Sequence, residues 1–166
     1  YARVKKESLV SLPQGLTLRE SMILGTAGFT AALCIHRFEQ NNQHPNLGPI
    51  VVTGASGGVG SFATNMLSML GYEVIAVSSK KDSVDYLKSL GASTVLSVEG
   101  LKLNTRPLDK IRFGGVLDNL GGDTLSKLSA HVNLWGNIAC VGLAQSHELN
   151  EMTVLPLRSE ERRVGK

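Results

Sequence analysis

The chain has 166 residues, 42% of them hydrophobic and 19% charged, which is enough apolar sequence for one sizeable core in about one domain. Its formal net charge of +3 owes +2 to the last stretch, 158–166, so the basic balance gives no reason to expect a nucleic-acid partner. No apolar run approaches the length of a membrane-spanning helix and no charged-then-apolar signal peptide is evident, so we expect a cytoplasmic protein without nucleic-acid or membrane partners.

The two ends of the chain bear on its organisation. The first residue is Tyr1 rather than Met, so we interpret the chain as a piece of a longer protein. At the other end an apolar segment, 152–157, is followed by a polar run, 158–166, which resembles the translation of a sequencing adapter. We interpret this run as a non-native tail that lies outside the fold.

The residues before 49 are predicted to form a short strand and two helices. Two apolar stretches within 1–12 favour a strand followed by a turn at Pro13. Thr17 and Glu20 have the spacing of a capping box, so a helix is expected to begin there. Small residues at 25–28 interrupt it, and a second helix is indicated by residues at helical spacing, namely Ala27, Ala31, Cys34, Ile35 and Phe38.

A strand, a glycine-rich turn and a helix are predicted next. Apolar and β-branched residues at 50–53 favour a strand buried on both faces, and apolar residues within 59–70 recur at helical spacing. The turn between them follows the dinucleotide fingerprint G-x-G-x-x-G in the form Ala55-x-Gly57-x-x-Gly60. In such a turn, backbone N–H groups at the helix N-terminus bind a pyrophosphate, and the last glycine lets helix and strand pack closely.

The rest of the chain alternates strands with helices. Strands are predicted at 73–78, 93–98, 113–118 and 137–141, helices at 82–90 and 123–132, and a loop with one helical turn at 99–112. This alternation indicates an α/β fold, a doubly wound parallel sheet with right-handed crossovers. A ligand of such a sheet binds beyond the carboxyl ends of the strands, which are followed here by residues 55–60, 78–81, 119–122 and 142–144.

The end of the second strand bears on the identity of the dinucleotide. An NAD site usually has Asp or Glu about twenty residues past the glycines, whereas this chain has Ser78-Ser79-Lys80-Lys81 there. Hydroxyl and ammonium groups suit a 2′-phosphate, so we predict NADPH rather than NADH as the cofactor. The alternative is that the two lysines are only a solvated approach to the next helix.

Residues 53–60 also satisfy the Thr-Gly-x-x-x-Gly-x-Gly pattern of short-chain dehydrogenases. That family needs a Tyr-x-x-x-Lys pair for catalysis, and the pair that this chain offers, Tyr1 with Lys5, precedes the glycine turn. The family also places its glycines near the N-terminus, whereas here residues 1–53 come before them. A short-chain dehydrogenase/reductase therefore stays an alternative of lower rank.

The cysteines and histidines give no indication of a metal site. Cys34 and Cys140 are too few and too far apart for a zinc quartet or a disulfide framework, and each is expected to pack as a small apolar residue. The histidines show no ligand spacing on one helix face, so we expect no metal; they are His36, His44, His131 and His147.

A further indication comes from four segments taken together, which are 24–33, 54–60, 86–92 and 140–144. They resemble the zinc-independent acrylyl-CoA reductase and quinone oxidoreductase branch of the medium-chain dehydrogenase/reductase superfamily. The resemblance implies that residues 1–48 are the end of a catalytic, GroES-like domain with its connecting helices. It implies that residues 49–157 are a Rossmann-type NADP-binding domain, doubly wound and truncated. Zinc-dependent relatives carry a cysteine ligand near the helix that begins here at Gly25, where this chain has none.

The resemblance also implies roles for residues at the strand ends. The pyrophosphate would be held by Ser56, Gly57, Gly58 and Val59, and the 2′-phosphate by Ser78, Ser79 and Lys80. Leu143 would approach the nicotinamide. The implied reaction is hydride transfer from NADPH to an activated C=C bond, as in an acrylyl-CoA-like enoyl thioester, or to a quinone, and the parent enzyme would be a homodimer.

The catalytic residues are not identified by this sequence. Asp118 lies at a strand end, but an acidic residue in that position is more often the partner of a turn or a helix cap. The resemblance places the substrate-side residues largely upstream of Tyr1, so the isolated chain is expected to be inactive. The second hypothesis is therefore a nucleotide-binding module without catalysis.

Overall fold

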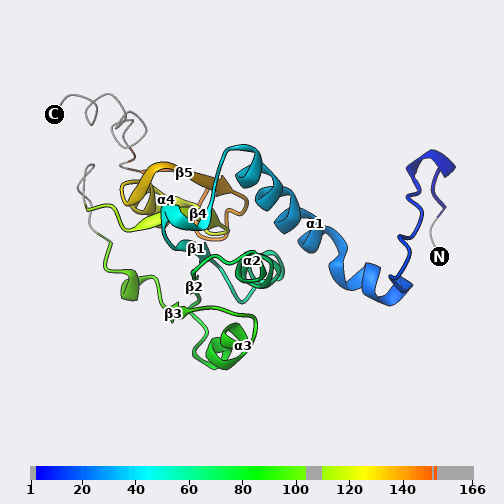
Figure 1. Ribbon diagram of the computed structural model, residues 1–166, viewed down its shortest axis with the longest axis horizontal. Helices are drawn as coiled ribbons and strands as arrows, with labels where there is room; N and C mark the ends of the chain where they lie inside the picture. Colours follow the sequence, from blue (N-terminus) through cyan, green and yellow to red (C-terminus); the bar gives the residue numbers. More distant parts are fainter. Residues whose placement is uncertain (1–2, 104–109, 151, 153–166) are drawn as a thin grey trace.

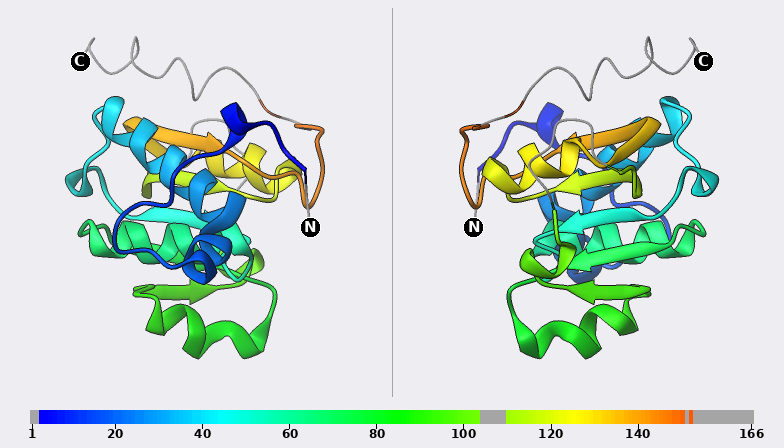
Figure 2. Two further views of the ribbon diagram at one scale, coloured as in Figure 1. Left: turned by 90° about the vertical axis from the view of Figure 1, so that its right-hand side faces the viewer. Right: turned by 90° about the vertical axis from the view of Figure 1, so that its left-hand side faces the viewer.

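The computed structural model describes residues 3–103, 110–150 and 152. The expected tail at 158–166 and part of the loop expected at 99–112 lie outside these residues. Five parallel strands form one sheet, and they are β1 (Ile50–Thr53), β2 (Val74–Val77), β3 (Thr94–Leu96), β4 (Phe113–Asp118) and β5 (Val132–Cys140). Their spatial order is β3-β2-β1-β4-β5, which Figure 2 shows with the strands side by side. This order matches the first five strands of a Rossmann-type sheet and confirms the predicted fold class.

Helices cover both faces of the sheet. They are α1 (Leu18–Gln40), α2 (Gly58–Met69), α3 (Val84–Ser89) and α4 (Gly122–Ser129). Four short 3-10 helices join them, η1 (Lys6–Ser8), η2 (Pro45–Leu47), η3 (Lys81–Ser83) and η4 (Glu99–Leu101). In Figure 1, α1 and α2 lie together on one side of the sheet, and η4 lies on the other.

The sheet separates two hydrophobic cores, and β1 contributes to both. Ile50 and Val52 belong to a core that includes residues of α1, α2 and α3, whereas Val51 belongs to a core with Leu101 of η4 and Leu128 of α4. This division follows from the alternation of side chains along a strand. Every residue of β1 is buried, as the continuous apolar run predicts for a central parallel strand.

The helix α1 has two dissimilar halves. Its start is a capping box in which Thr17 Oγ1 accepts from Glu20 N at 3.2 Å and Glu20 Oε2 accepts from Thr17 N at 2.8 Å, as the sequence predicted. Gly25 has φ 45° and ψ −151°, which is not helical and marks the predicted interruption. The buried residues of α1 all follow this break, and they are Gly28, Ala31, Ile35 and Phe38. Only the second half therefore holds the helix to the core.

Three expectations about element bounds are wrong, and one of them is the helix expected at 123–132, which ends at Ser129 because β5 begins at Val132. Residues 3–12 form η1 and irregular chain rather than a strand, and Leu9 and Val10 are exposed, because these residues have no neighbouring strand to pair with in the described sheet. The last strand begins at Val132 rather than at 137, since a register shift between Phe113 and Gly115 lets Val132 pair with Phe113.

The helix α1 corrects the expectation that no apolar segment approaches the length of a membrane-spanning helix. The helix α1 has 23 residues and contains an 18-residue window with a mean hydropathy of 1.2, so by length and composition alone it could cross a membrane. This is weak evidence, because helices in the core of a soluble protein pass the same test. Its second half packs here against α2.

Candidate functional site

The carboxyl ends of the strands bring together the segments that the sequence singled out. Because all five strands are parallel, the residues that follow β1, β2, β4 and β5 lie at one edge of the sheet. The chain continues from β1 to β2 and β3 in one direction and returns to β4 on the other side of β1. The order thus reverses between β1 and β4, which is where α/β sheets of this kind bind ligands.

The glycine-rich turn connects β1 directly to the N-terminus of α2. Gly57 is the N-cap of α2, and it has no side chain with which to cap the first-turn amides. Gly57 and Gly58 are exposed, so their backbone is open to an anion. A Cβ at position 60 would lie 2.4 Å from the carbonyl oxygen of Gly54, so only glycine fits there. The turn has the geometry that its fingerprint predicts for a pyrophosphate cradle.

A cluster of hydroxyl groups joins this turn to the end of β2. Ser56 Oγ lies 3.0 Å from Ser78 Oγ, and the backbone N–H of Lys80 donates to Ser78 Oγ at 3.1 Å. Ser83 Oγ lies 3.1 Å from Ser78 Oγ and donates to the carbonyl of Lys80 at 2.6 Å. Ser79 and Lys80 are exposed at the same edge. The structure therefore brings Ser56, Ser78 and Lys80 together.

Ser83 also belongs to this cluster, although the residue pattern alone did not indicate it. It is buried, lies in η3 and touches both Ser78 and the backbone of Lys80. The signal available in the sequence was its position three residues after Lys80, directly before a helix, where serine often bonds to the backbone. Its contact with Ser78 depends on the fold of the turn and could not be inferred from spacing.

Asp118 fixes the turn that follows β4. Its side chain is fully buried, with Oδ1 accepting from Thr53 Oγ1 at 2.6 Å and Oδ2 accepting from Gly121 N at 2.6 Å. Burial raises the pKa of this carboxyl, while hydrogen bonds from Thr53 and from backbone amides act in the opposite direction. Its expected role as the partner of a turn is confirmed.

The turn after β5 lies against the turn after β4. Gly142 N donates to the carbonyl of Asp118 at 3.1 Å, and Ala144 N donates to the carbonyl of Asn119 at 3.3 Å. Leu143, between them, is 66% exposed. Its apolar side chain therefore lies at the same edge as Asp118 and is not taken up by the core of the described residues.

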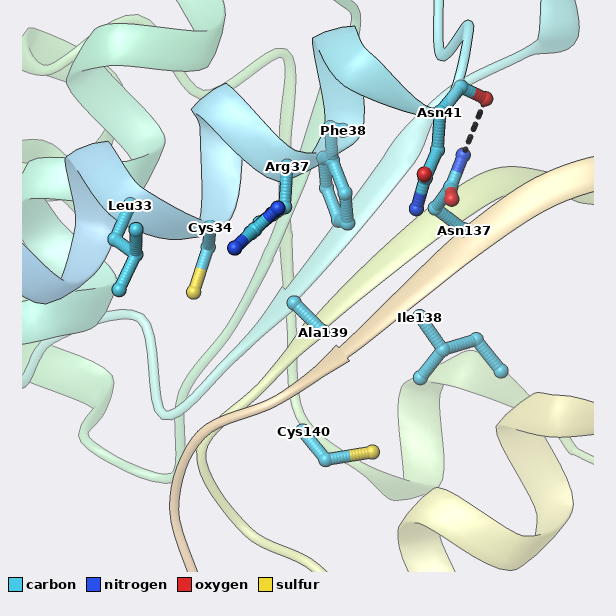
Figure 3. A pocket seen from close by; sticks show the side chains of 9 residues that line it. All are labelled: Leu33, Cys34, Arg37, Phe38, Asn41, Asn137, Ile138, Ala139 and Cys140. Atoms are coloured by element: carbon cyan, nitrogen blue, oxygen red, sulfur yellow. Dashed lines mark hydrogen bonds between the residues drawn. The ribbon is translucent and has the colours of Figure 1, made fainter.

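Two hollows lie on α1, and the lining of the first reaches Cys140 at the carboxyl end of β5. One, of about 260 Å³, lies between the second half of α1 and the edge strand β5; Figure 3 shows its lining, which includes Cys34, Arg37 and Asn137. Another, of about 300 Å³, lies between α1 and α2. Neither is lined by the residues predicted to hold the cofactor.

The thiols and carboxylates do not assemble into a metal centre in the part of the chain that the structure describes. No group of three or more His, Cys, Asp or Glu side chains that could hold a metal is found there. Burial raises the pKa of the Cys34 thiol and of the Cys140 thiol. The Asp118 carboxylate, which lies opposite Cys140 in the strand pairing, raises the pKa of Cys140 further.

Comparison with known proteins identifies close relatives of this chain. Residues 58–165 match the model of the zinc-binding dehydrogenase family. The chain is 49% identical over 155 residues to a probable acrylyl-CoA reductase, AcuI, of Escherichia coli K12, and these residues cover 93% of the chain and 47% of that protein. It is 45% identical over 157 residues to a putative quinone oxidoreductase, YhfP, of Bacillus subtilis, covering 94% and 47%. The chain thus spans about half the length of the curated relatives it matches.

Solved structures of similar proteins have the same fold. The YhdH oxidoreductase of Salmonella enterica, in complex with NADP, is 46% identical with a TM-score of 0.90, over 96% of this chain and 49% of that one. Bacillus subtilis YhfP, with NAD bound, is 44% identical with a TM-score of 0.89, over 95% and 48%. The short-chain pattern at 53–60 is therefore coincidental, because these relatives belong to the medium-chain superfamily that the sequence resembles.

Proposed function

Because this chain belongs to the zinc-binding dehydrogenase family, we propose that its carboxyl edge binds NADPH and that the complete protein is an oxidoreductase. The reaction is hydride transfer to an activated C=C bond, as in an acrylyl-CoA-like enoyl thioester, or to a quinone. The observation that carries the proposal is the glycine turn at the N-terminus of α2, joined through Ser56 and Ser78 to the end of β2. A dinucleotide with a 2′-phosphate needs these two groups side by side.

The residues present fit such a cofactor. Gly57 and Gly58 leave the first turn of α2 open, and a Cβ at Gly58 would lie 3.1 Å from the Cβ of Ala27, so the backbone is held close to α1 as well. Together with Ser56 and Val59 they would hold the pyrophosphate. NADPH, when bound, supplies the hydride.

The 2′-phosphate is assigned to Ser78, Ser79 and Lys80. Two hydroxyls and one ammonium group supply donors and a positive charge at the end of β2, and a carboxylate that would repel a phosphate is missing from 78–81. Relatives have been solved with NADP and with NAD, and the residues at 78–81 support NADPH as the dinucleotide that this chain prefers.

Leu143 is assigned to the nicotinamide end of the cofactor. It is exposed at the carboxyl edge of β5, on the opposite side of the switch point from Ser78. A bulky apolar side chain there excludes water from one face of a reacting ring. Further groups that contact the substrate are assigned to a GroES-like domain whose end is residues 1–48, with the NADP-binding domain at 49–157 and a non-native tail at 158–166.

We further propose that the enzyme needs no zinc, acts in the cytoplasm and forms a homodimer. The first point is supported by the missing cysteine near Gly25 and the last by β5, which lies at the edge of the described sheet. A nucleotide-binding module without catalysis is the competing function, because the described residues supply a cradle and no evident acid or base for a substrate.

Turnover separates the two functions. We expect the full-length protein to oxidise NADPH, followed by loss of its absorbance, when acrylyl-CoA, crotonyl-CoA or a quinone is added. Prior treatment with a metal chelator should leave the rate unchanged. NADPH binding without turnover of any enoyl thioester or quinone would contradict the enzyme and favour the binding module.

A further inference from the structure

The buried carboxylate of Asp118 lies where the order of the strands reverses. Asp118 is the last residue of β4 and Thr53 the last of β1, and the pairing of Val52 with Leu117 places them opposite each other. The hydrogen bond from Thr53 Oγ1 to Asp118 Oδ1, at 2.6 Å, therefore spans the switch point itself. Because Asp118 is 0% exposed, it can act on a ligand only through its neighbours.

The same carboxylate holds the turn 119–122 in an unusual conformation. Gly121 has φ 70°, and its N–H donates to Asp118 Oδ2 at 2.6 Å. On the other side of the turn, Asn119 N donates to Thr53 Oγ1 at 2.8 Å and Asn119 Nδ2 donates to the Thr53 carbonyl at 2.7 Å. Asp118 and Thr53 thus anchor both ends of the turn to the strand ends.

The turn 119–122 contacts and supports the segment 142–146, which follows β5. A Cβ on Gly142 would lie 2.4 Å from the carbonyl oxygen of Asn119, so the two turns are in close backbone contact. Gln145 N donates to the carbonyl of Leu120 at 2.7 Å, and Gly121 forms a bridge with Ser146. Leu143 lies within this supported segment, and its position depends on the turn that Asp118 anchors.

The location of the turn indicates which part of a dinucleotide it serves. A Rossmann-type sheet binds the two mononucleotides on opposite sides of the switch point. The hydroxyl cluster around Ser78 is on the side of β2, whereas Gly121 and Leu143 are on the side of β4 and β5. The two sides are joined here by the hydrogen bond between Thr53 and Asp118.

We propose that Asp118 is a positioning residue for the nicotinamide half of the cofactor, which it serves by fixing the turn 119–122 and, through it, Leu143. The inference rests on the proposed function and adds to it a residue that touches neither cofactor nor substrate. Burying a carboxylate is unfavourable unless hydrogen bonds compensate for the lost hydration. The buried carboxylate of Asp118 holds the turn 119–122 in a single conformation. A ligand that binds only this conformation would bind more weakly if the turn were free to adopt others.

The test compares a whole dinucleotide with one of its halves. We would measure the Kd of NADPH and of 2′,5′-ADP, which lacks the nicotinamide, for the full chain and for Asp118→Ala and Asp118→Asn. Asp118→Ala should raise the Kd of NADPH about tenfold and change that of 2′,5′-ADP less than about twofold. Asp118→Asn keeps the volume of the side chain but cannot accept hydrogen bonds from both Thr53 and Gly121. We therefore expect a smaller rise in the Kd of NADPH, again with little change in the Kd of 2′,5′-ADP.

Controls make the outcome decisive. Asp123→Asn removes an exposed carboxylate from the first turn of α4 and should leave both Kd values unchanged. The emission of bound NADPH at saturation, which reports the surroundings of the nicotinamide, should fall in the Asp118 variants. If Asp118→Ala does not fold, Asp118→Asn carries the test. Equal weakening of NADPH and 2′,5′-ADP, or no weakening of either, would overturn the proposal, whereas a wild-type chain that binds neither would overturn the proposed function as well.

Discussion

At the scale of single residues, Gly60 shows how one missing side-chain atom permits the candidate site. A Cβ there would lie 2.4 Å from Gly54 O and 2.6 Å from Ala55 Cα, distances at which the turn and α2 could not both keep their positions. The fingerprint predicted this requirement, because a glycine in that position lets helix and strand approach closely.

We therefore expect Gly60→Ala to lower the free energy of unfolding by about 1–3 kcal/mol through overpacking. Gly100→Ala is the matched control, since its Cβ would meet nothing closer than 3.4 Å and its φ is not positive. That variant should stay within about 0.5 kcal/mol of the wild type. Urea unfolding of both variants measures the difference, and equal midpoints would contradict the account.

The hydroxyl cluster shows what residue patterns leave out. The types and positions of Ser78 and Lys80 in the sequence were enough to predict a phosphate site at the end of β2. They could not reveal that Ser83 touches Ser78 and the Lys80 backbone, because those contacts depend on how η3 turns back toward the strand. The same holds for Asp118, whose hydrogen bonds to Thr53 and Gly121 arise from strand pairing.

At the scale of elements, α1 consists of two consecutive helical segments that meet at the non-helical residue Gly25. The stretch before Gly25 buries no residue, and its large side chains Leu18, Met22 and Ile23 are exposed, whereas the stretch after it packs into the core. Helices that lack packing are marginally stable in water even when their caps are good.

We predict that amide hydrogen exchange divides α1 at Gly25. Amides in 18–24 should exchange much faster than those in 28–40, because only the second stretch opens together with the core. Mass spectrometry of peptides from the two stretches measures this directly. Equal protection across the whole helix would show that the first half is stabilised by contacts other than those described.

Elements with a strong local pattern were predictable, and those fixed by tertiary contacts were not. The bounds of β1 and α2 were predicted closely from the apolar run 50–53 and from the helical spacing within 59–70. A strand buried on both faces has a continuous apolar run, whereas a helix buried on one face has apolar residues at helical spacing. The start of β5 was missed because a register shift opposite Phe113 sets it. Residues 3–12 look like a strand in sequence but have no strand to pair with in the described sheet.

At the scale of the whole molecule, the parallel sheet collects four separate turns at one edge. Residues distant in sequence, such as Ser56, Ser78 and Leu143, thereby lie at one edge, where we propose that they bind one ligand. The hydrogen bond between Thr53 and Asp118 connects the two halves of that edge. The fold class and the position of this edge could be predicted from the alternation of strands and helices. The substrate could not, because the chain spans about half the length of its curated relatives and the substrate-side groups are assigned elsewhere.

The central claim is that this edge binds NADPH through its 2′-phosphate, and calorimetric titration with NADPH and NADH tests it most directly. The wild-type chain should bind NADPH more tightly than NADH. Lys80→Ala should raise the Kd of NADPH about tenfold and leave the Kd of NADH unchanged, because only NADPH carries the phosphate. Ser83→Ala should have the same effect, because Ser83 contacts both Ser78 and the backbone of Lys80. Ser89→Ala, which likewise removes a hydroxyl bonded to the carbonyl three residues earlier, at 2.7 Å, should change neither. Equal Kd values for NADPH and NADH in the wild-type chain would contradict the claim.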